Sequence, residues 1–219
     1  MNNALNISEI FCSFQGESTL VGRNTLFIRT SSCNLSCSMC DTRYSFKDKI
    51  QIKIQDICKI IKTVGYKYIC ITGGEPLLQT KEINELIKAI LPMGVIISIE
   101  TNGSLPINKI NKKVKRVLDV KTPSTNEEGS FLLSNLKELT KNDEIKFFIS
   151  NRKDFDYAIN FINRYKPKGA ILFSPNLKNK ELTKKISNWI LASGKDIVFQ
   201  PQLHKLIKEN PIYIIDPKH

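Results

Sequence analysis

Short apolar segments alternate with amphipathic segments along most of the chain, and this alternation constrains the fold more than any other feature. Seven segments are rich in β-branched and aromatic residues and are bounded by turn-forming residues, a pattern typical of buried parallel strands. These segments are residues 25–29, 68–72, 95–100, 117–121, 145–149, 170–173 and 197–200. Strands that alternate with helices form a mostly parallel sheet with right-handed crossovers. We therefore predict an α/β fold.

Four segments between these strands carry apolar residues at helical spacing. Their stripes run through residues 54–64, 83–91, 155–165 and 182–190. Each stripe follows the i, i+3, i+4, i+7 pattern of a helix that packs one face on a core. Thr80 precedes the second stripe and is predicted to be its N-cap, and Pro92 and Gly94 are predicted to end it. No internal repeat, linker or low-complexity tract is found, so we expect a single domain over residues 1–219.

The composition is that of an ordinary globular chain, with 41% hydrophobic and 25% charged residues in 219. No apolar run approaches the length of a membrane span, and the N-terminal residues lack the pattern of a secretory signal. The formal net charge of +12 comes mostly from Lys, and the most basic stretch, residues 108–116, contains no aromatic residue. A solvated surface explains this charge better than a nucleic-acid site does. We therefore expect a cytoplasmic protein with no nucleic-acid and no membrane partner.

Polar and glycine-rich segments follow the predicted strands. In barrels and open α/β sheets, ligands bind beyond the carboxyl ends of the strands. The segments found there are a cysteine-rich stretch after residue 29, then Gly73 to Pro76, Glu100 to Gly103, Lys121 to Ser124, Ser174 to Asn176, and Pro201 with Gln202. We expect them to converge on one site.

Three cysteines, Cys33, Cys37 and Cys40, follow the pattern C-x3-C-x2-C. A reducing compartment disfavours disulfides, so clustered thiols indicate a metal or a catalytic site. Structural zinc uses four ligands, usually in two pairs, and a second pair is missing. Three thiolates on a four-iron cluster would leave one iron open to a small molecule. The spacing favours the iron–sulfur cluster, with zinc and an absence of metal as alternatives.

The cysteine pattern, followed some thirty residues later by Gly73-Gly74-Glu75-Pro76, resembles the radical S-adenosylmethionine (SAM) superfamily. Met39 is a departure, since an aromatic residue is common before the third cysteine. The resemblance implies a partial, open TIM-like barrel, abbreviated relative to larger radical SAM enzymes. It also implies that the open iron binds the amino and carboxylate groups of SAM.

A narrower resemblance covers about residues 8 to 207. Phe14-Gln15-Gly16-Glu17, Arg29 before the first cysteine, and Cys40-Asp41-Thr42 are similar to 7-carboxy-7-deazaguanine synthases. Ser18 stands where that family usually has glycine, and residues 208–219 match no pattern. The resemblance implies a lyase that converts 6-carboxy-5,6,7,8-tetrahydropterin to 7-carboxy-7-deazaguanine with loss of ammonia, on the route to queuosine-type nucleosides.

The same resemblance implies four sets of site residues. The three cysteines would hold a [4Fe-4S] cluster, and Thr42 would bind Mg²⁺, because a hydroxyl oxygen suits a hard cation. From the sequence alone, Thr42 could equally cap a helix. The residues implied to bind substrate are Phe14, Gln15, Gly16, Glu17, Arg29, Thr72 and His204. The residues implied to bind SAM are Met39, Asp41, Gly73, Gly74, Glu75, Glu100, Asn102, Lys121, Ser124, Gln200, Pro201 and Gln202.

Residue chemistry fits several of these roles and leaves alternatives. Arg29 offers a planar donor fork to the substrate carboxylate, or it forms a structural ion pair. Gln15 and Glu17 can read the amide and amine edges of the pterin, or they satisfy a turn. His204 can donate or relay a proton near neutral pH, or it is an ordinary polar residue.

The resemblance also implies partners, namely an electron donor of the flavodoxin or ferredoxin type and a second copy in a homodimer. Two other functions remain open from the sequence. One is a radical SAM activase that makes a glycyl radical on a partner protein. The other is a metal-stabilised nucleic-acid-binding module, which the charge of +12 would suit.

Overall fold

The structure, a computed structural model, describes residues 3–47, 49–208 and 210–216. In that part of the chain, ten strands form one sheet in the order β10-β1-β2-β4-β5-β6-β7-β8-β9, with β3 paired to β1 off this path. The strands are β1 (Ala4–Phe14), β2 (Asn24–Thr30), β3 (Ile50–Lys53), β4 (Tyr68–Gly73), β5 (Ile96–Thr101), β6 (Lys115–Val120), β7 (Glu144–Ile149), β8 (Ala170–Pro175), β9 (Val198–Phe199) and β10 (Ile212–Ile215).

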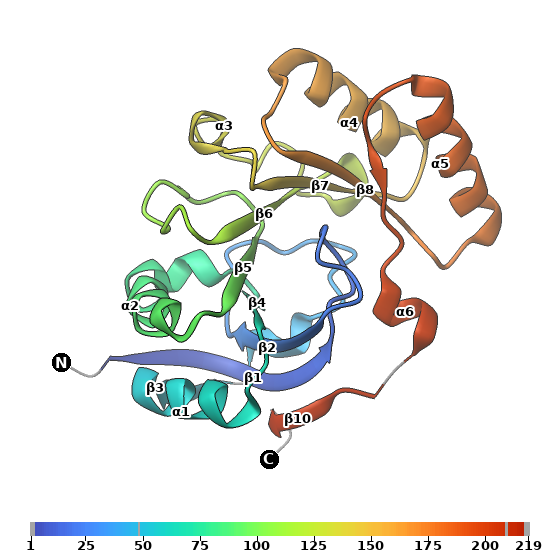
Figure 1. The fold of residues 1–219 in the computed structure, drawn as a ribbon. Helices are drawn as coiled ribbons and strands as arrows, with labels where there is room; N and C mark the ends of the chain where they lie inside the picture. The colour runs from blue at the N-terminus through green and yellow to red at the C-terminus, as the bar shows by residue number, and fades with distance from the viewer. Residues whose placement is uncertain (1–2, 48, 209, 217–219) are drawn as a thin grey trace.

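The sheet is a curved and open barrel, as predicted. From β2 through β4, β5, β6, β7 and β8 to β9, each neighbouring pair is parallel. Strand β1 is antiparallel to β2, β3 and β10. The path ends at β9 on one side and β10 on the other, so the barrel does not close (Figure 1). All seven predicted strands are present.

Helices connect the parallel strands and cover the outside of the sheet (Figure 1). The α-helices are α1 (Ile54–Val64), α2 (Thr80–Ile90), α3 (Asn135–Glu138), α4 (Arg152–Tyr165), α5 (Lys180–Ser193) and α6 (Leu203–Ile207). The 3-10 turns are η1 (Arg43–Phe46), η2 (Pro76–Gln79), η3 (Leu91–Met93) and η4 (Pro123–Thr125). The four segments predicted to be helical correspond to α1, α2, α4 and α5.

The predicted N-cap of α2 was wrong. Gln79 occupies the cap position and Thr80 is the first helical residue. The Thr80 hydroxyl donates instead to the Leu77 carbonyl at 2.6 Å, a local side-chain-to-backbone bond that threonine commonly makes to the preceding turn. Gly65 and Gly194 end α1 and α5 in the left-handed conformation, which glycine adopts without strain.

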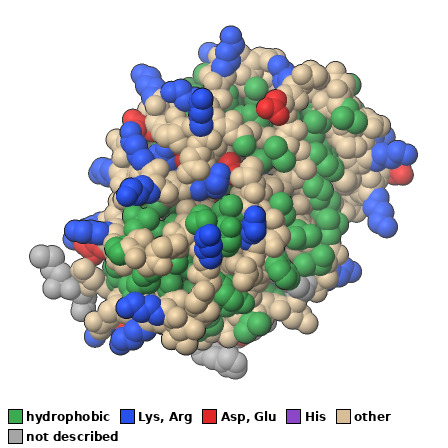
Figure 2. All heavy atoms as spheres, viewed as in Figure 1, with side chains coloured by type: hydrophobic (Ala, Val, Ile, Leu, Met, Phe, Trp, Pro, Cys, Tyr) green, Lys and Arg blue, Asp and Glu red, His purple; other side chains and the backbone are tan. Residues whose placement is uncertain are grey.

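An isoleucine-rich core joins the sheet to α1, α2, α4 and α5. Its fully buried members include Ile57 on α1, Ile83 on α2 and Ile28 on β2. Edge-to-face rings extend it, with Phe147 packing against both Phe161 and Phe173. Lys and Arg side chains are spread over the face of the molecule shown in Figure 2 rather than gathered in one patch.

Two elements at the ends of the chain were not predicted. Strand β1 is eleven residues long and passes beside both β2 and β3. Strand β10 comes from the tail that matched no pattern, and it pairs Tyr213 with Phe11 and Ile212 with Cys12. No helix in the described ranges has the length and apolar character needed to cross a bilayer.

Candidate active site

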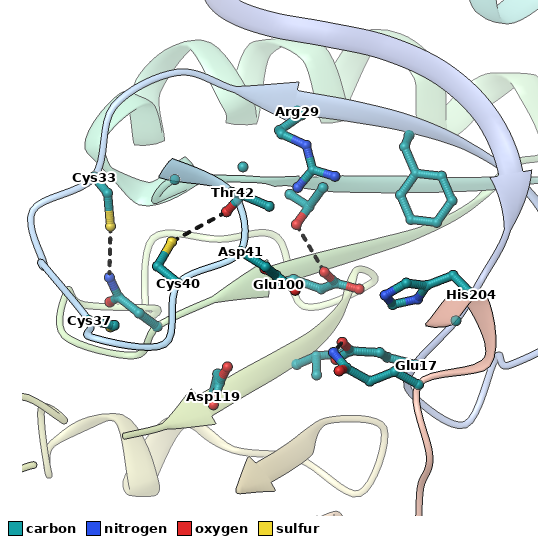
Figure 3. A pocket seen from close by; sticks show the side chains of 18 of the residues that line it. Glu17, Arg29, Cys33, Cys37, Cys40, Asp41, Thr42, Glu100, Asp119 and His204 are labelled. Atoms are coloured by element: carbon teal, nitrogen blue, oxygen red, sulfur yellow. Dashed lines mark hydrogen bonds between the residues drawn. The ribbon is translucent and has the colours of Figure 1, made fainter. Parts of the chain in front are cut away.

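A cavity of about 430 Å³ opens at the carboxyl ends of the parallel strands. Its lining comes from β1 and the turn after it, from β2 and the loop after it, from β4, β5 and β6 with the residues that follow them, and from β7. Gln202, His204, Lys205, Pro211 and Tyr213 complete it. Figure 3 shows the three cysteines on one side of this cavity, and Glu17 and His204 on the other. Five of the six predicted segments contribute to the lining, as the strand-end rule requires, and the sixth, Ser174 to Asn176 after β8, does not.

The loop of residues 31–42, here called the cysteine loop, holds three free thiols. Cys33 Sγ lies 3.5 Å from the Leu35 amide, which donates to it, and 3.8 Å from Asn102 Nδ2. Cys40 Sγ lies 3.6 Å from the hydroxyl of Thr42. Burial raises the pKa of the Cys33 and Cys37 thiols, and the charge of Lys121 opposes that shift. The thiols are therefore partly enclosed and beside a cation.

Contacts at several points fix the cysteine loop to the segment after β6 and to the turn η1. The Ser36 amide donates to Glu127 at 2.6 Å, and the Ser38 amide donates to the Thr125 carbonyl at 2.9 Å. Arg43 Nη2 donates to the Cys37 carbonyl at 2.8 Å. These hydrogen bonds restrain the loop, so its thiols are held in one arrangement. A ligand that binds several thiols at once requires such a fixed arrangement.

Gly74 is needed where β4 meets the cysteine loop. A Cβ there would collide with the Ser32 carbonyl and lie 3.0 Å from Cys33 Cβ. The next residue, Glu75, is buried below this contact and accepts hydrogen bonds from Leu77, Thr101 and Asn102. Burial raises its pKa against those bonds. Glu75 thus holds the Asn102 segment in place.

Carboxylate and amide groups from three elements form the opposite wall. Glu100, on β5, accepts from the Thr72 hydroxyl at 2.9 Å and lies 3.3 Å from Gln15 Nε2. Burial and then the charge of Glu17 raise the Glu100 pKa. Glu17 accepts from Gln202 and Lys146, each at 2.5 Å. Burial would raise the pKa of Glu17, but the Lys146 ammonium and the hydrogen bond from Gln202 together lower it.

Arg29 enters the cavity from β2 with its position set by neighbours. Its Nε donates to the buried Glu9 carboxylate at 2.5 Å, and its guanidinium lies 5.5 Å from the Phe11 ring centre. Tyr44 donates to the same Glu9 oxygen at 2.9 Å. Burial, with the nearby Glu9 charge, raises the Tyr44 pKa to about 12 against the effect of Arg29. Because only Nε is used in this ion pair, the terminal nitrogens of Arg29 can face a ligand carboxylate.

A row of buried charges lies on β6 and β7. Lys146 Nζ is 3.2 Å from Asp119, and Lys121 Nζ is 3.1 Å from the same Asp119 oxygen. Burial opposes ionisation of Asp119, but the two ammonium groups lower its pKa to about 2. This row connects the Glu17 side of the cavity to the cysteine side.

His204 lies directly against the backbone of Gly16. The Leu203 amide donates to the Gly16 carbonyl at 2.9 Å, and a Cβ on Gly16 would collide with the imidazole ring. Burial lowers the His204 pKa, with the Glu17 charge opposing. The neutral imidazole is therefore favoured at neutral pH.

A family model of the radical SAM superfamily matches residues 27–171. A 7-carboxy-7-deazaguanine synthase of Thermoplasma acidophilum is 36% identical over 92% of this chain and 96% of its own. The chain belongs to the radical SAM superfamily. A Koribacter versatilis protein of the same name is 34% identical over 93% and 96% of the two chains. The crystal structure of QueE from Escherichia coli superposes with a TM-score of 0.75 at 19% identity, covering 92% and 95%.

Most residues that were expected to form the radical SAM site line one cavity. All predicted substrate residues and the predicted magnesium residue are there, together with the three cysteines. The predicted SAM residues that also line it are Met39, Asp41, Gly73, Gly74, Glu100, Asn102, Lys121 and Gln202. These positions are near one another, and the ligand each of them binds stays a prediction.

Four residues predicted to bind SAM are not among the cavity-lining residues: Glu75, Ser124, Gln200 and Pro201. The Ser124 amide and hydroxyl both donate to Asp154 at the start of α4. Gln200 exchanges two hydrogen bonds with the backbone of Ser18, at 2.8 and 2.6 Å. Ser18 has a left-handed φ of 62°, so Gln200 holds a turn that glycine would adopt more readily.

Sequence reasoning missed several polar residues of the radical SAM cavity. They include Glu9, Tyr44, Asp119, Lys146 and Lys205. Asp119 and Lys146 had a readable signal, since each is a charge inside an otherwise apolar stretch, Val117 to Val120 and Ile145 to Ile149. Such a charge is costly unless it is paired or used in a site.

Proposed function

We propose that this chain is a 7-carboxy-7-deazaguanine synthase. It is a radical SAM lyase that converts 6-carboxy-5,6,7,8-tetrahydropterin to 7-carboxy-7-deazaguanine with loss of ammonia, for the biosynthesis of queuosine-type 7-deazapurines. The observation that carries this function is the match to synthases of that name over nearly the whole of both chains. The cavity supports it, because thiols face a wall of carboxylate, amide and guanidinium groups. Residues 1–219 act as one domain.

Cys33, Cys37 and Cys40 would hold a [4Fe-4S] cluster. Their thiols are free, lie on one anchored loop and border the cavity, which fits a cluster whose fourth iron faces a cofactor. Among the described residues, no three His, Cys, Asp or Glu side chains converge as the ligands of one ion do, and a cluster does not require that convergence because each thiolate binds its own iron. When bound, the cluster and SAM supply a 5′-deoxyadenosyl radical, which takes a hydrogen atom from the substrate.

SAM would lie between the cysteine loop and the ends of β4, β5 and β6. Gly73 and Gly74 bring backbone close to that space, and Asn102 and Lys121 border it. Gly74 lacks a side chain, so the strand end approaches the cysteine loop closely. Lys121 offers a charged donor to the carboxylate of SAM.

The substrate would occupy the other half of the cavity. Arg29 binds the carboxylate of the pterin through its terminal nitrogens, since Glu9 holds only Nε. Glu17 accepts from amino and ring N–H groups, and Gln15 supplies both a donor and an acceptor. His204, kept neutral by burial, can donate or accept one proton beside Gly16.

Thr42 is the proposed Mg²⁺ residue. Its hydroxyl borders the cavity near Cys40, and a hydroxyl oxygen suits an ion that retains several waters and binds substrate oxygens. We further propose an electron donor of the flavodoxin or ferredoxin type, a homodimer and a cytoplasmic location. On the face shown in Figure 2, Lys and Arg side chains are dispersed rather than gathered in one patch, which supports a solvated surface there over a nucleic-acid site.

The experiment is an anaerobic assay of reconstituted protein. The protein is loaded with iron and sulfide and mixed with SAM, Mg²⁺, a strong reductant and 6-carboxy-5,6,7,8-tetrahydropterin, and the products are followed by mass. We expect 7-carboxy-7-deazaguanine and ammonia. Formation of 5′-deoxyadenosine alone would keep the radical chemistry and reject the substrate. Absence of both products from a loaded enzyme would redirect the search to a protein substrate, as for a glycyl-radical activase.

A further inference from the structure

Among the described residues, Lys146 is the only lysine whose ammonium contacts two carboxylates that both line the cavity, Glu17 and Asp119. Its side chain is 13% exposed, and that of Glu17 is 12% exposed. Neither the predicted site nor the proposed mechanism gives Lys146 a task. A mostly buried ammonium that contacts charged groups of a cavity is a candidate functional residue.

The contacts of Lys146 come from separate parts of the chain. Lys146 is on β7, Asp119 is on the neighbouring strand β6, and Glu17 is in the turn after β1. The carboxylate of Glu100 on β5 also acts on Lys146 through its charge. One ammonium therefore faces three acidic groups, and Lys121 pairs only with Asp119 among them.

The geometry at Glu17 defines what this ammonium does. Lys146 binds Oε2 of Glu17 and Gln202 binds Oε1, so the carboxylate plane is fixed from two sides. Each carboxylate oxygen can accept a second hydrogen bond, and Glu17 also borders the cavity. The acceptor atoms of Glu17 are therefore oriented and kept charged before a ligand arrives.

We propose that Lys146 is a positioning residue that holds Glu17 as an ionised, oriented acceptor for the 2-amino group of the substrate's pyrimidine ring. This inference rests on the proposed function. It adds that the Lys146 ammonium sets the specificity of the site for the substrate's ring. Without Lys146, Glu17 would face Glu100 and Asp119 with no cation of its own, and close carboxylates then share protons. A protonated or rotated Glu17 would no longer prefer an amino group over a carbonyl oxygen.

The test compares two stable aromatic probes that differ in one group. 6-Carboxypterin carries the 2-amino group, and 6-carboxylumazine has an oxygen in its place, so a charged acceptor should favour the first and repel the second. Binding is measured by fluorescence titration of the anaerobic holoenzyme without reductant, so no turnover is involved. The readout is the ratio of the two Kd values.

We expect wild-type protein to bind 6-carboxypterin at least about tenfold more tightly than 6-carboxylumazine. Lys146→Gln should reduce that ratio about tenfold, equal to about 1.4 kcal/mol, and Lys146→Arg should restore most of it. Lys146→Met provides a second charge-free variant if the glutamine variant folds poorly. Lys115→Gln is the matched control, because Lys115 is 16% exposed and paired with Glu144, but does not line the cavity; its ratio should be unchanged.

The outcomes separate this inference from the proposed function. If wild-type protein binds neither probe, a pterin is the wrong substrate and both fail. If wild-type protein discriminates and the charge-free variants discriminate equally well, the role of Lys146 is rejected while the function stands. If both probes weaken equally in the variants, Lys146 supports the fold of the wall only, and the inference is also rejected.

Discussion

The close contact between Gly16 and His204 leaves no room for a side chain at residue 16. A Cβ on residue 16 would lie 3.0 Å from Cγ and Cε1 of His204 and closer still to Nδ1, where unstrained contacts are about 3.5–4.0 Å. Gly16 has no positive φ, so alanine itself suits the backbone. The imidazole must therefore move, and overpacking of this kind costs about 1–3 kcal/mol.

The Gly16→Ala variant should lose about 1–2 kcal/mol of unfolding free energy, since reduced chain entropy in the unfolded state returns about 0.4–1 kcal/mol. It should also raise the KM for the pterin, because His204 leaves its place in the cavity. The double variant with His204→Ala should regain most of the stability, giving a coupling of about 1–3 kcal/mol in anaerobic urea titrations. Strictly additive effects of the two changes would refute the reasoning.

Three further predictions concern the same cavity. Glu9→Gln removes the charge that holds Arg29, so the pterin KM should rise about tenfold, in line with about 1.4 kcal/mol for a weakened charge-assisted bond. SAM binding should be unaffected, and an unchanged KM would contradict this. Asp119→Asn should lower the free energy of unfolding by about 2–3 kcal/mol at pH 7, because the Asp119 pKa, lowered from 3.8 to about 2, stabilises the folded state above pH 4. That contribution is lost as the pH falls towards 2, so urea titrations of the two proteins should converge there. Cys37→Ala should lose the cluster's iron and turnover together, and retention of both in iron and product analysis would reject the cluster assignment.

Local pattern predicted the strands that are buried on both faces. Residues 68–72 and 145–149 are nearly continuous apolar runs, and both are strands of the parallel sheet. Strand β1 was missed because Ser8 and Glu9, although buried, interrupt its apolar pattern. Strand β10 was missed because it exists through pairing with β1, some two hundred residues away, and no local pattern carries that information.

The same limit applies to the site. Motifs identified residues that border the cavity, such as Arg29 and Thr42, because the chemistry of each motif can be read from a few neighbouring positions. The partners of these residues could not be read in that way. Glu9 meets Arg29 only because β1 and β2 pair. Lys146 meets Glu17 only because the turn after β1 reaches β7, where Thr19 also bonds Glu144. Residues that position a site residue from a distant part of the sequence can be identified only once the pairing of the strands in three dimensions is known.

The cavity is built from two parts of the chain, and this division has a consequence for function. The cysteine side comes from loops that follow β2, β4 and β5. The other side comes largely from the chain ends, where Gln200 binds Ser18, Leu203 binds Gly16 and Gln202 binds Glu17. A binding site can change independently of the fold that carries it. Substitutions in the chain ends can therefore alter which substrate ring is recognised while the cysteine loop stays intact. Substitutions near Gly16 and His204 should therefore change which pterin binds before they change SAM cleavage.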